Sequence, residues 1–276
     1  MALANNPLRQ YFRRPAIFLK LPSQGIGYPE GVLNTTETGE FPVYPMTAID
    51  EITSRTPDAL FNSSAVSDII KSCIPDILDP WRLQSTDLDA VLIAIKSASQ
   101  GNQLDIQTEC PNCKEVSEYG VNLVGILSTL KAPDYSKEIQ INNLSIKLRP
   151  LLYKEMNQAA LKQFEMQRLF NSLTTIEDET ERGVKTTEGI ATITKVTMEV
   201  LAGTIEYIAT PSGKVTEKPF ILDFLQNCDS ETYSAIRDYN TELKNASEMK
   251  PMHITCTNCQ HEYDQNFTFN ASDFFG

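Results

Sequence analysis

The chain has 276 residues, 41% of them hydrophobic, and a formal net charge of −12 at pH 7. This length can bury a large core and favours two folded regions, while no apolar run approaches the roughly 20 residues of a membrane span. The acidity disfavours binding to phosphate backbones, which needs clustered Lys and Arg, and weakly favours protein partners.

The amino terminus is the basic exception in this acidic chain. Residues 1–15, MALANNPLRQYFRRP, lack the apolar middle of a secretory signal, so we expect no export. Ahead of any acidic residue they interleave basic and large apolar side chains, namely Leu8, Arg9, Tyr11, Phe12, Arg13 and Arg14. Because Arg and Tyr are favoured interface anchors, we predict an arm that docks on another subunit. The alternative is a strand tied to a sheet by AIFLKLPS, and both can hold if the arm precedes the strand.

The next region, residues 16–130, is predicted to be a mixed α+β unit with short helices. Glycines and prolines punctuate its first part and predict extended structure with turns. A helix is expected to begin after Thr47, because Asp50 three residues later comes close to completing a capping box. Two more helices are predicted over SSAVSDIIKSCI and STDLDAVLIAIKSASQ, the second with an apolar face formed by Leu88, Val91, Leu92 and Ile95.

Two C-x-x-C pairs stand far apart in the chain. Cys110 and Cys113 follow the predicted helices, and Cys256 and Cys259 lie near the end. Both pairs have flanks rich in Ile, Val, Tyr and Phe with partial alternation, which is typical of hairpins. One such turn presents two thiolates to an ion, and four thiolates complete the tetrahedral shell of a structural zinc site. We therefore predict a split zinc ribbon that fastens both ends of the intervening segment.

Other interpretations of the cysteines stay open. The four could form two disulfides or remain buried thiols, although disulfides need an oxidising compartment. His261, just after the second pair, could replace one ligand. The remaining cysteines, Cys73 and Cys228, stand alone in apolar helical stretches and are predicted to be core thiols.

Between the two pairs, residues 131–250 are predicted to form a mainly helical insertion. It begins with a hairpin, EIQINNLSIKLRPL, turning at Asn142 and Asn143. The acidic stretch TTIEDETERGVKTTEG is expected to be an exposed loop or helix end, and IATITKVTMEVLAGTIEYIA a helix because it is too long for a strand. Helices over FILDFLQNC and SETYSAIRDYNTELKNAS then lead to the second cysteine pair and tail, 251–276. Another long helix, YKEMNQAALKQFEMQRLFNSL, follows the hairpin, with an apolar stripe of Met156, Ala159, Ala160, Phe164 and Leu169.

The sequence contains no recognisable set of catalytic residues, so we expect a structural protein and not an enzyme. The only two histidines, His253 and His261, both flank the second cysteine pair. The glycine-rich GIGYPEG lacks the Lys and Ser/Thr of a P-loop. A metal-dependent hydrolase would need an open position at the metal, which four sulfur ligands do not leave.

Several stretches carry a family resemblance. They are NPLRQYFRRPAIFLKLPSQGIGYPEG, TGEFPVYPMTAIDEITSRTPDAL and ILDPWRLQSTDLDAVLIAIKSASQG, followed by CPNC and, at the end, CTNCQHEYDQNFTFNASDFFG. Together they resemble the baseplate hub subunit family of T4-like contractile-tailed bacteriophages. The resemblance covers residues 6–125 with several motifs, and the middle helices are only loosely similar.

The resemblance implies a virion structural protein of the tail baseplate that is made in the host cytoplasm. Its implied partners are other hub, spike, wedge or tail-tube proteins in a symmetric hetero-oligomeric assembly, with no nucleic acid. Some relatives are treated as assembly factors, so a hub chaperone is the nearest alternative. A zinc-ribbon nucleic-acid-binding module is the alternative from another class.

The last residues include two adjacent large apolar rings, Phe274 and Phe275. Leaving each in water costs roughly 1.5–3 kcal/mol. We therefore expect them to fill a pocket, either on this chain or on a neighbouring subunit.

Overall fold

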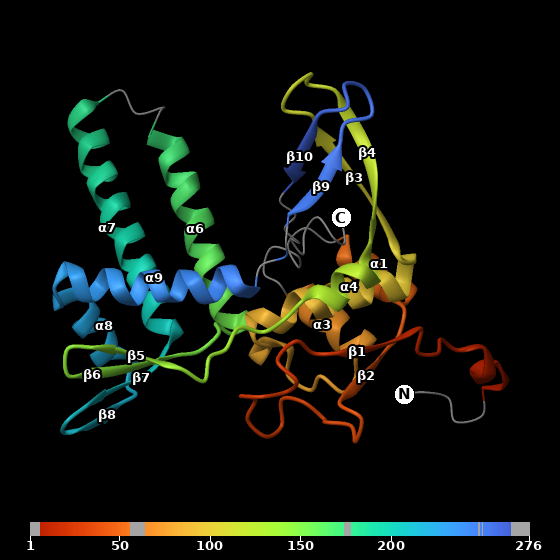
Figure 1. Ribbon diagram of the computed structural model, residues 1–276, viewed down its shortest axis with the longest axis horizontal. Helices are drawn as coiled ribbons and strands as arrows, with labels where there is room; N and C mark the ends of the chain where they lie inside the picture. The colour runs from red at the N-terminus through yellow and green to blue at the C-terminus, as the bar shows by residue number, and fades with distance from the viewer. Residues whose placement is uncertain (1–5, 56–63, 174–177, 248, 250, 266–276) are drawn as a thin grey trace. The chain divides into compact units, whose positions relative to one another are not determined.

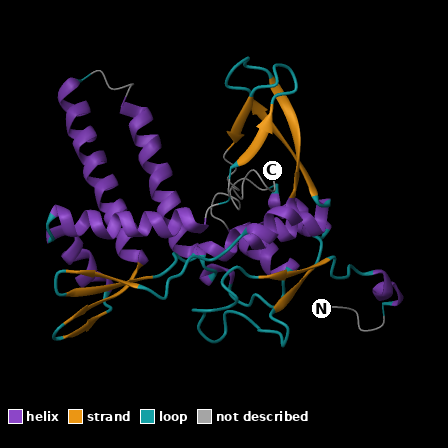
Figure 2. Ribbon diagram, viewed as in Figure 1, coloured by secondary structure: helices purple, strands orange, loops and turns teal. Residues whose placement is uncertain are grey.

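The computed structural model describes residues 6–55, 64–173, 178–247, 249 and 251–265. It contains helices and small antiparallel sheets, which confirms the expected mixture of the two (Figures 1 and 2). The described parts of 1–80, 87–131 and 249–276 form a first compact unit, and those of 81–86 and 132–248 form a second. Among the described helices, none is both long enough and apolar enough to cross a membrane.

The first unit begins with a short 3-10 helix, η1 (Pro7–Tyr11), and a two-stranded sheet. Strands β1 (Ile17–Lys20) and β2 (Glu40–Val43) pair antiparallel. Helix α1 (Ala48–Ser54) starts as the sequence predicted: the Thr47 side chain accepts the Asp50 N–H, and the Asp50 carboxylate accepts the Thr47 N–H. The capping box is therefore confirmed.

Helices α3 (Ser64–Cys73) and α4 (Ser85–Gln100) supply half of the first unit's buried hydrophobic residues, and the short 3-10 helix η2 (Pro80–Arg82) lies between them in the chain. The four apolar residues predicted to share a face of α4 are all buried. Ala90, Ile93 and Ala94 are buried as well, so α4 is enclosed on more than one side. The prediction therefore named four residues that are indeed buried, but the buried surface of α4 is wider than the predicted face.

The Asp87 carboxylate attaches the turn-rich segment to α4. It accepts the backbone N–H of Ser23 at 2.8 Å, and it also accepts the hydroxyls of Ser23 and Tyr28. Burial raises the pKa of this carboxyl, and the hydrogen bonds from Ser23 and Tyr28 oppose that rise. The glycine-rich turns thus have a fixed attachment inside the core.

Two antiparallel hairpins complete the first unit. The first pairs β3 (Gln103–Glu109) with β4 (Val116–Asn122) and continues into helix α5 (Leu123–Thr129). The second pairs β9 (Met252–Thr255) with β10 (Glu262–Gln265). Figure 1 shows the two hairpins side by side, with their turns at the same end.

The second unit is built on a four-stranded antiparallel sheet. Its order is β5 (Glu138–Ile141), β6 (Leu144–Leu148), β7 (Ile205–Thr210) and β8 (Gly213–Val215). The predicted Asn142–Asn143 turn joins β5 to β6, and Asn142 has the expected left-handed backbone with φ of 52°. The predicted hairpin is confirmed.

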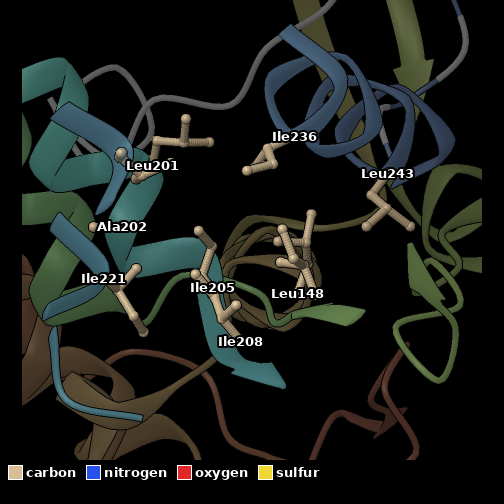
Figure 3. Close-up of a cluster of buried hydrophobic side chains, with 10 residues drawn as sticks. Leu148, Leu201, Ala202, Ile205, Ile208, Ile221, Ile236 and Leu243 are labelled. Atoms are coloured by element: carbon tan, nitrogen blue, oxygen red, sulfur yellow. The ribbon is translucent and has the colours of Figure 1, made fainter. Parts of the chain in front are cut away.

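The helices of the second unit are α6 (Tyr153–Leu173), α7 (Glu179–Thr204), α8 (Lys218–Asn227) and α9 (Ser230–Ser247). Side chains from the sheet and from α7, α8 and α9 converge in one apolar core (Figure 3). Its members are Ile146, Leu148, Leu201, Ala202, Ile205, Ile208, Ile221, Leu225, Ile236 and Leu243.

Two element predictions in this unit need correction, and the helix-end alternative for the acidic stretch is confirmed. The helix expected through IEYIA ends at Thr204, because Ile205 and Ile208 are buried in strand β7 between β6 and β8. Residues 179–189 of the acidic stretch form the first turns of α7, capped by the Asp178 carboxylate. None of the five residues in the predicted α6 stripe is fully buried.

Helices α6 and α7 run side by side (Figure 1). At one point the contact is tight, because a Cβ atom added at Gly189 would lie 2.9 Å from the ring of Phe170, which would have to shift. A Cβ at Gly183 of the same helix would meet nothing within 4 Å. The two glycines therefore have different roles.

Candidate metal centre

The turn between β3 and β4 carries the first cysteine pair. The Cys110 N–H donates to the Glu115 carbonyl at 2.9 Å, and the Lys114 N–H donates to the Cys110 carbonyl at 3.0 Å. Lys114 has a positive φ of 62°. These bonds shape a tight turn, called here the first knuckle (residues 110–115), that presents both thiols on one side.

The turn between β9 and β10 repeats this design residue for residue. The Cys256 N–H donates to the His261 carbonyl at 2.9 Å, and the Gln260 N–H donates to the Cys256 carbonyl at 3.0 Å. Gln260 has a φ of 57°. This second knuckle (residues 256–261) is therefore a backbone copy of the first, although the two are far apart in the chain.

Hydrogen bonds join the two hairpins along their length. The hydroxyls of Thr108 and Tyr263 lie 2.5 Å apart, and those of Ser117 and Thr257 lie 3.2 Å apart. The Tyr119 hydroxyl donates to the Thr255 carbonyl at 3.3 Å. These contacts bring the knuckles face to face.

The four sulfurs meet between the knuckles, all within 4.8 Å of one another. Cys110 and Cys259 are 3.7 Å apart at Sγ, and so are Cys113 and Cys256. Zinc–sulfur bonds of about 2.3 Å in a regular tetrahedron place sulfurs about 3.8 Å apart, whereas a disulfide holds them at about 2.0 Å. The spacing therefore matches the edge of a tetrahedral metal shell.

An asparagine in each knuckle donates to a sulfur of the other knuckle. The Asn112 amide lies 3.6 Å from Cys259 Sγ, and the Asn258 amide lies 3.8 Å from Cys113 Sγ. Donation of an N–H to sulfur favours the thiolate form. This pair is visible in the sequence, because CPNC and CTNC both have Asn before their second cysteine.

The electrostatics of the four thiols on their own oppose the ionisation of all of them at once. The His261 backbone N–H and the Asn112 amide lower the pKa of Cys259 to about 6. The Glu115 backbone N–H lowers the pKa of Cys113, but burial and the three neighbouring thiols outweigh it and raise the value to about 11. A bound cation would supply the charge that lets all four become thiolates.

The alternative ligand His261 and the two predicted core thiols, Cys73 and Cys228, lie outside this group. The cluster consists of the four cysteines, and the His261 ring instead stacks at 6.3 Å on that of Tyr263. Cys73 is fully buried, as predicted, and burial raises its pKa to about 12. Cys228 is only half-buried.

Most of the predicted docking residues in the amino-terminal arm are exposed to solvent. Leu8, Tyr11 and Phe12 are 60%, 76% and 55% exposed, and Arg9 and Arg14 are exposed as well. Phe274 and Phe275 lie outside the described residues.

Arg13 differs from the other arm residues because it contacts the body of the first unit. It donates to the Ser72 carbonyl at 2.8 Å and pairs with Asp50 at 3.5 Å. Its guanidinium carbon also lies 5.7 Å from the centre of the Tyr44 ring. Arg13 therefore anchors the arm, a long-range contact that the sequence did not indicate.

The second unit contains a cavity of about 400 Å³. It lies between α6, α7 and α8, and its charged groups are paired internally: Lys162 with Glu199, and Lys218 with backbone carbonyls at the end of α7. Burial lowers the pKa of Lys218 to about 8. The lining residues include no Ser, Cys or His nucleophile–base pair.

Comparison with known proteins gives one match. The sequence model of the family described as T4 bacteriophage base plate protein matches residues 45–276. This range includes both knuckles and the whole second unit. It does not include residues 1–44. No curated protein and no solved structure matches the chain.

Proposed function

The chain belongs to the T4 bacteriophage base plate protein family, and from this we propose that it is a structural, non-catalytic component of the hub of a contractile-tail baseplate. The observation that carries the proposal is the family match over residues 45–276. The internally paired charges of the cavity and the all-cysteine cluster agree with a structural role. Membership supports the baseplate, and the hub position rests on the resemblance of the amino-terminal stretches.

Within this role, the cysteine cluster binds one structural zinc ion through all four thiolates. The donor set is typical of zinc, and the 3.7 Å sulfur contacts fit its tetrahedral shell. Four sulfurs complete the coordination and leave no position for a reacting water. The ion stabilises the fold.

The magnitudes explain why an ion is useful here. Cys113 and Cys256 are 143 positions apart, and closing a loop of that length costs about 5 kcal/mol of chain entropy. Five hydrogen bonds join the hairpins, three through hydroxyls and two from Asn112 and Asn258 to sulfur, and at roughly 0.5–1.5 kcal/mol each they are only comparable to this cost. A structural zinc site supplies an apparent 10–16 kcal/mol or so and exceeds it clearly.

The arm is the proposed docking element. Tyr11 and Phe12 offer large exposed apolar surface beside the exposed Arg9 and Arg14, while Arg13 holds the base of the arm to α1 and α3. Burying such aromatic and arginine side chains is a common source of interface affinity. The partners we propose are hub, spike, wedge or tail-tube proteins of a symmetric assembly, with Phe274 and Phe275 as a second anchor.

Quantitative mass spectrometry of finished phage particles and of assembly intermediates tests this function. Recovery in both, at a fixed ratio to other baseplate proteins, supports a structural component of the virion. Recovery only in intermediates assigns the chain to an assembly chaperone made and used in the host cytoplasm. Absence from every baseplate complex rejects the proposal.

A matched pair of variants tests the arm. Tyr11→Ala with Phe12→Ala should weaken co-purification with baseplate intermediates while leaving thermal unfolding unchanged, because both rings are exposed. Phe18→Ala removes a ring that is 65% exposed outside the arm and serves as the control. Equal loss of binding in both variants would argue against a specific arm contact.

A further inference from the structure

Each crossing sulfur pair in the cluster joins one buried thiol to one accessible thiol. Cys110 is 1% exposed and contacts the half-buried Cys259, while Cys256 is 0% exposed and contacts the half-buried Cys113. A reversible thiol cross-link needs an accessible sulfur that meets the oxidant and a neighbouring thiol that resolves the product. Both crossing pairs provide these two parts.

We propose that the metal-free cluster is an oxidative cross-linking site, where a hydroperoxide forms the disulfides Cys110–Cys259 and Cys113–Cys256. In each pair the sulfur of the accessible cysteine attacks the peroxide oxygen as its proton passes to the departing oxygen, giving a sulfenic acid and releasing an alcohol, or water from hydrogen peroxide. The buried thiol then attacks the sulfenic sulfur, which forms the S–S bond and releases water. Each pair loses two electrons, and one O–O bond accepts them.

The geometry favours cross-links between the knuckles over cross-links within one knuckle. Each crossing pair is already in contact at 3.7 Å, and about 1.7 Å of further approach forms a disulfide. The amides of Asn112 and Asn258 also hold the accessible sulfurs toward the opposite knuckle. Side-chain rotation can therefore complete the bond while the hydrogen-bonded turns keep their backbone.

Either form of the cluster fastens the two hairpins. Free thiols suit metal binding in a reducing cytoplasm, and disulfides persist in oxidising surroundings. If the proposed function is right, the protein passes from the first environment to the second when particles leave the cell. Only this biological consequence rests on the proposed function, because the cross-link itself rests on the sulfur positions.

Peptide mapping of the wild-type chain tests the cross-link. The protein is treated with a chelator, then with hydrogen peroxide, alkylated and digested with trypsin without reduction. Cys110 and Cys113 fall in one tryptic peptide and Cys256 and Cys259 in another, because no Lys or Arg separates the members of either pair. We expect the two peptides joined by two disulfides. Separate peptides with internal disulfides, or thiols that remain open to alkylation, would overturn the proposal.

Two double variants test the pairing. Cys113→Ser with Cys256→Ser keeps a crossing pair, and Cys113→Ser with Cys259→Ser keeps the two buried thiols. Both variants remove one thiol from each knuckle, so their loss of metal ligands is matched. The first should cross-link about tenfold faster or more, because it alone keeps an accessible sulfur. Equal rates in samples with the same circular dichroism spectrum would refute the assigned pairs.

Zinc content, measured before oxidation, separates this inference from the proposed zinc site. A chain that binds zinc but forms disulfides only within each knuckle would refute the inference and leave the zinc site standing. A chain that binds no zinc but forms the joined peptides would do the reverse.

Discussion

Replacing Cys256 with serine should remove the metal and loosen the hairpin that ends the described chain. Cys256 is fully buried at the centre of the cluster and contacts Cys113 at 3.7 Å. A serine hydroxyl is a poor zinc ligand, so three thiolates and a water would remain. We expect about one zinc per chain in the wild type and nearly none in the variant.

The size of the effect follows from the closed loop. Without the ion, the five hydrogen bonds between the hairpins must offset about 5 kcal/mol of loop entropy. The second hairpin should therefore separate from the first in a large fraction of molecules. In the wild type, each tenfold rise in free zinc should add about 1.4 kcal/mol to stability once the site is saturated.

Elemental analysis and thermal unfolding, each with and without chelator, measure these effects. The control is Cys228→Ser, which removes a half-buried thiol outside the cluster and should keep the zinc. Because the chain has two compact units, the chelator should lower only the transition of the first unit. Two results would refute the reasoning. One is an unchanged zinc content in Cys256→Ser, and the other is a thermal unfolding transition of the reduced wild type that is the same with and without chelator.

Three further predictions concern stability. Arg13→Ala should destabilise the first unit by about 1–3 kcal/mol in urea unfolding, because it leaves the largely buried Asp50 carboxylate without its ion pair. The exposed Arg9 is the control, and Arg9→Ala should be nearly neutral. Equal effects of the two variants would contradict the role of Arg13 as an anchor. Burial raises the pKa of Asp89 from 3.8 to about 6, so the folded state binds more protons and stability should fall as pH rises through that window. Asp89→Asn should remove this slope and add about 1–3 kcal/mol at pH 7; an unchanged slope would exclude Asp89 as its source. Gly189→Ala should cost about 1–3 kcal/mol by forcing α6 and α7 apart, whereas Gly183→Ala should gain about 0.5–1 kcal/mol, and the same sign for both would contradict the packing.

Local rules were enough for the features that depend on neighbouring residues. The Thr47–Asp50 capping box and the Asn142 turn were predicted because each is stabilised within a few positions. Each C-x-x-C turn is local in the same sense. The meeting of the two turns was inferred from valence alone, since one pair cannot complete a tetrahedral shell.

Features that depend on packing between residues far apart in the chain could not be predicted from the sequence. The stretch from Ile205 to Thr210 is β-branched and apolar like the end of α7, and its pairing with β6 and β8 makes it a strand. The same limit applies to Arg13, whose partners Asp50 and Ser72 are remote in sequence. Periodicity identifies apolar faces but does not say which neighbour covers them.

The joined hairpins also determine how the chain carries mechanical load. Cys113 and Cys256, one from each knuckle, are 143 positions apart along the backbone, yet their sulfurs lie 3.7 Å apart. Tension between the hairpins therefore crosses a few atoms at the cluster and bypasses the sheet and helices of the second unit. Once the cluster is closed by an ion or by disulfides, a pull between the hairpins no longer has to pass through that unit.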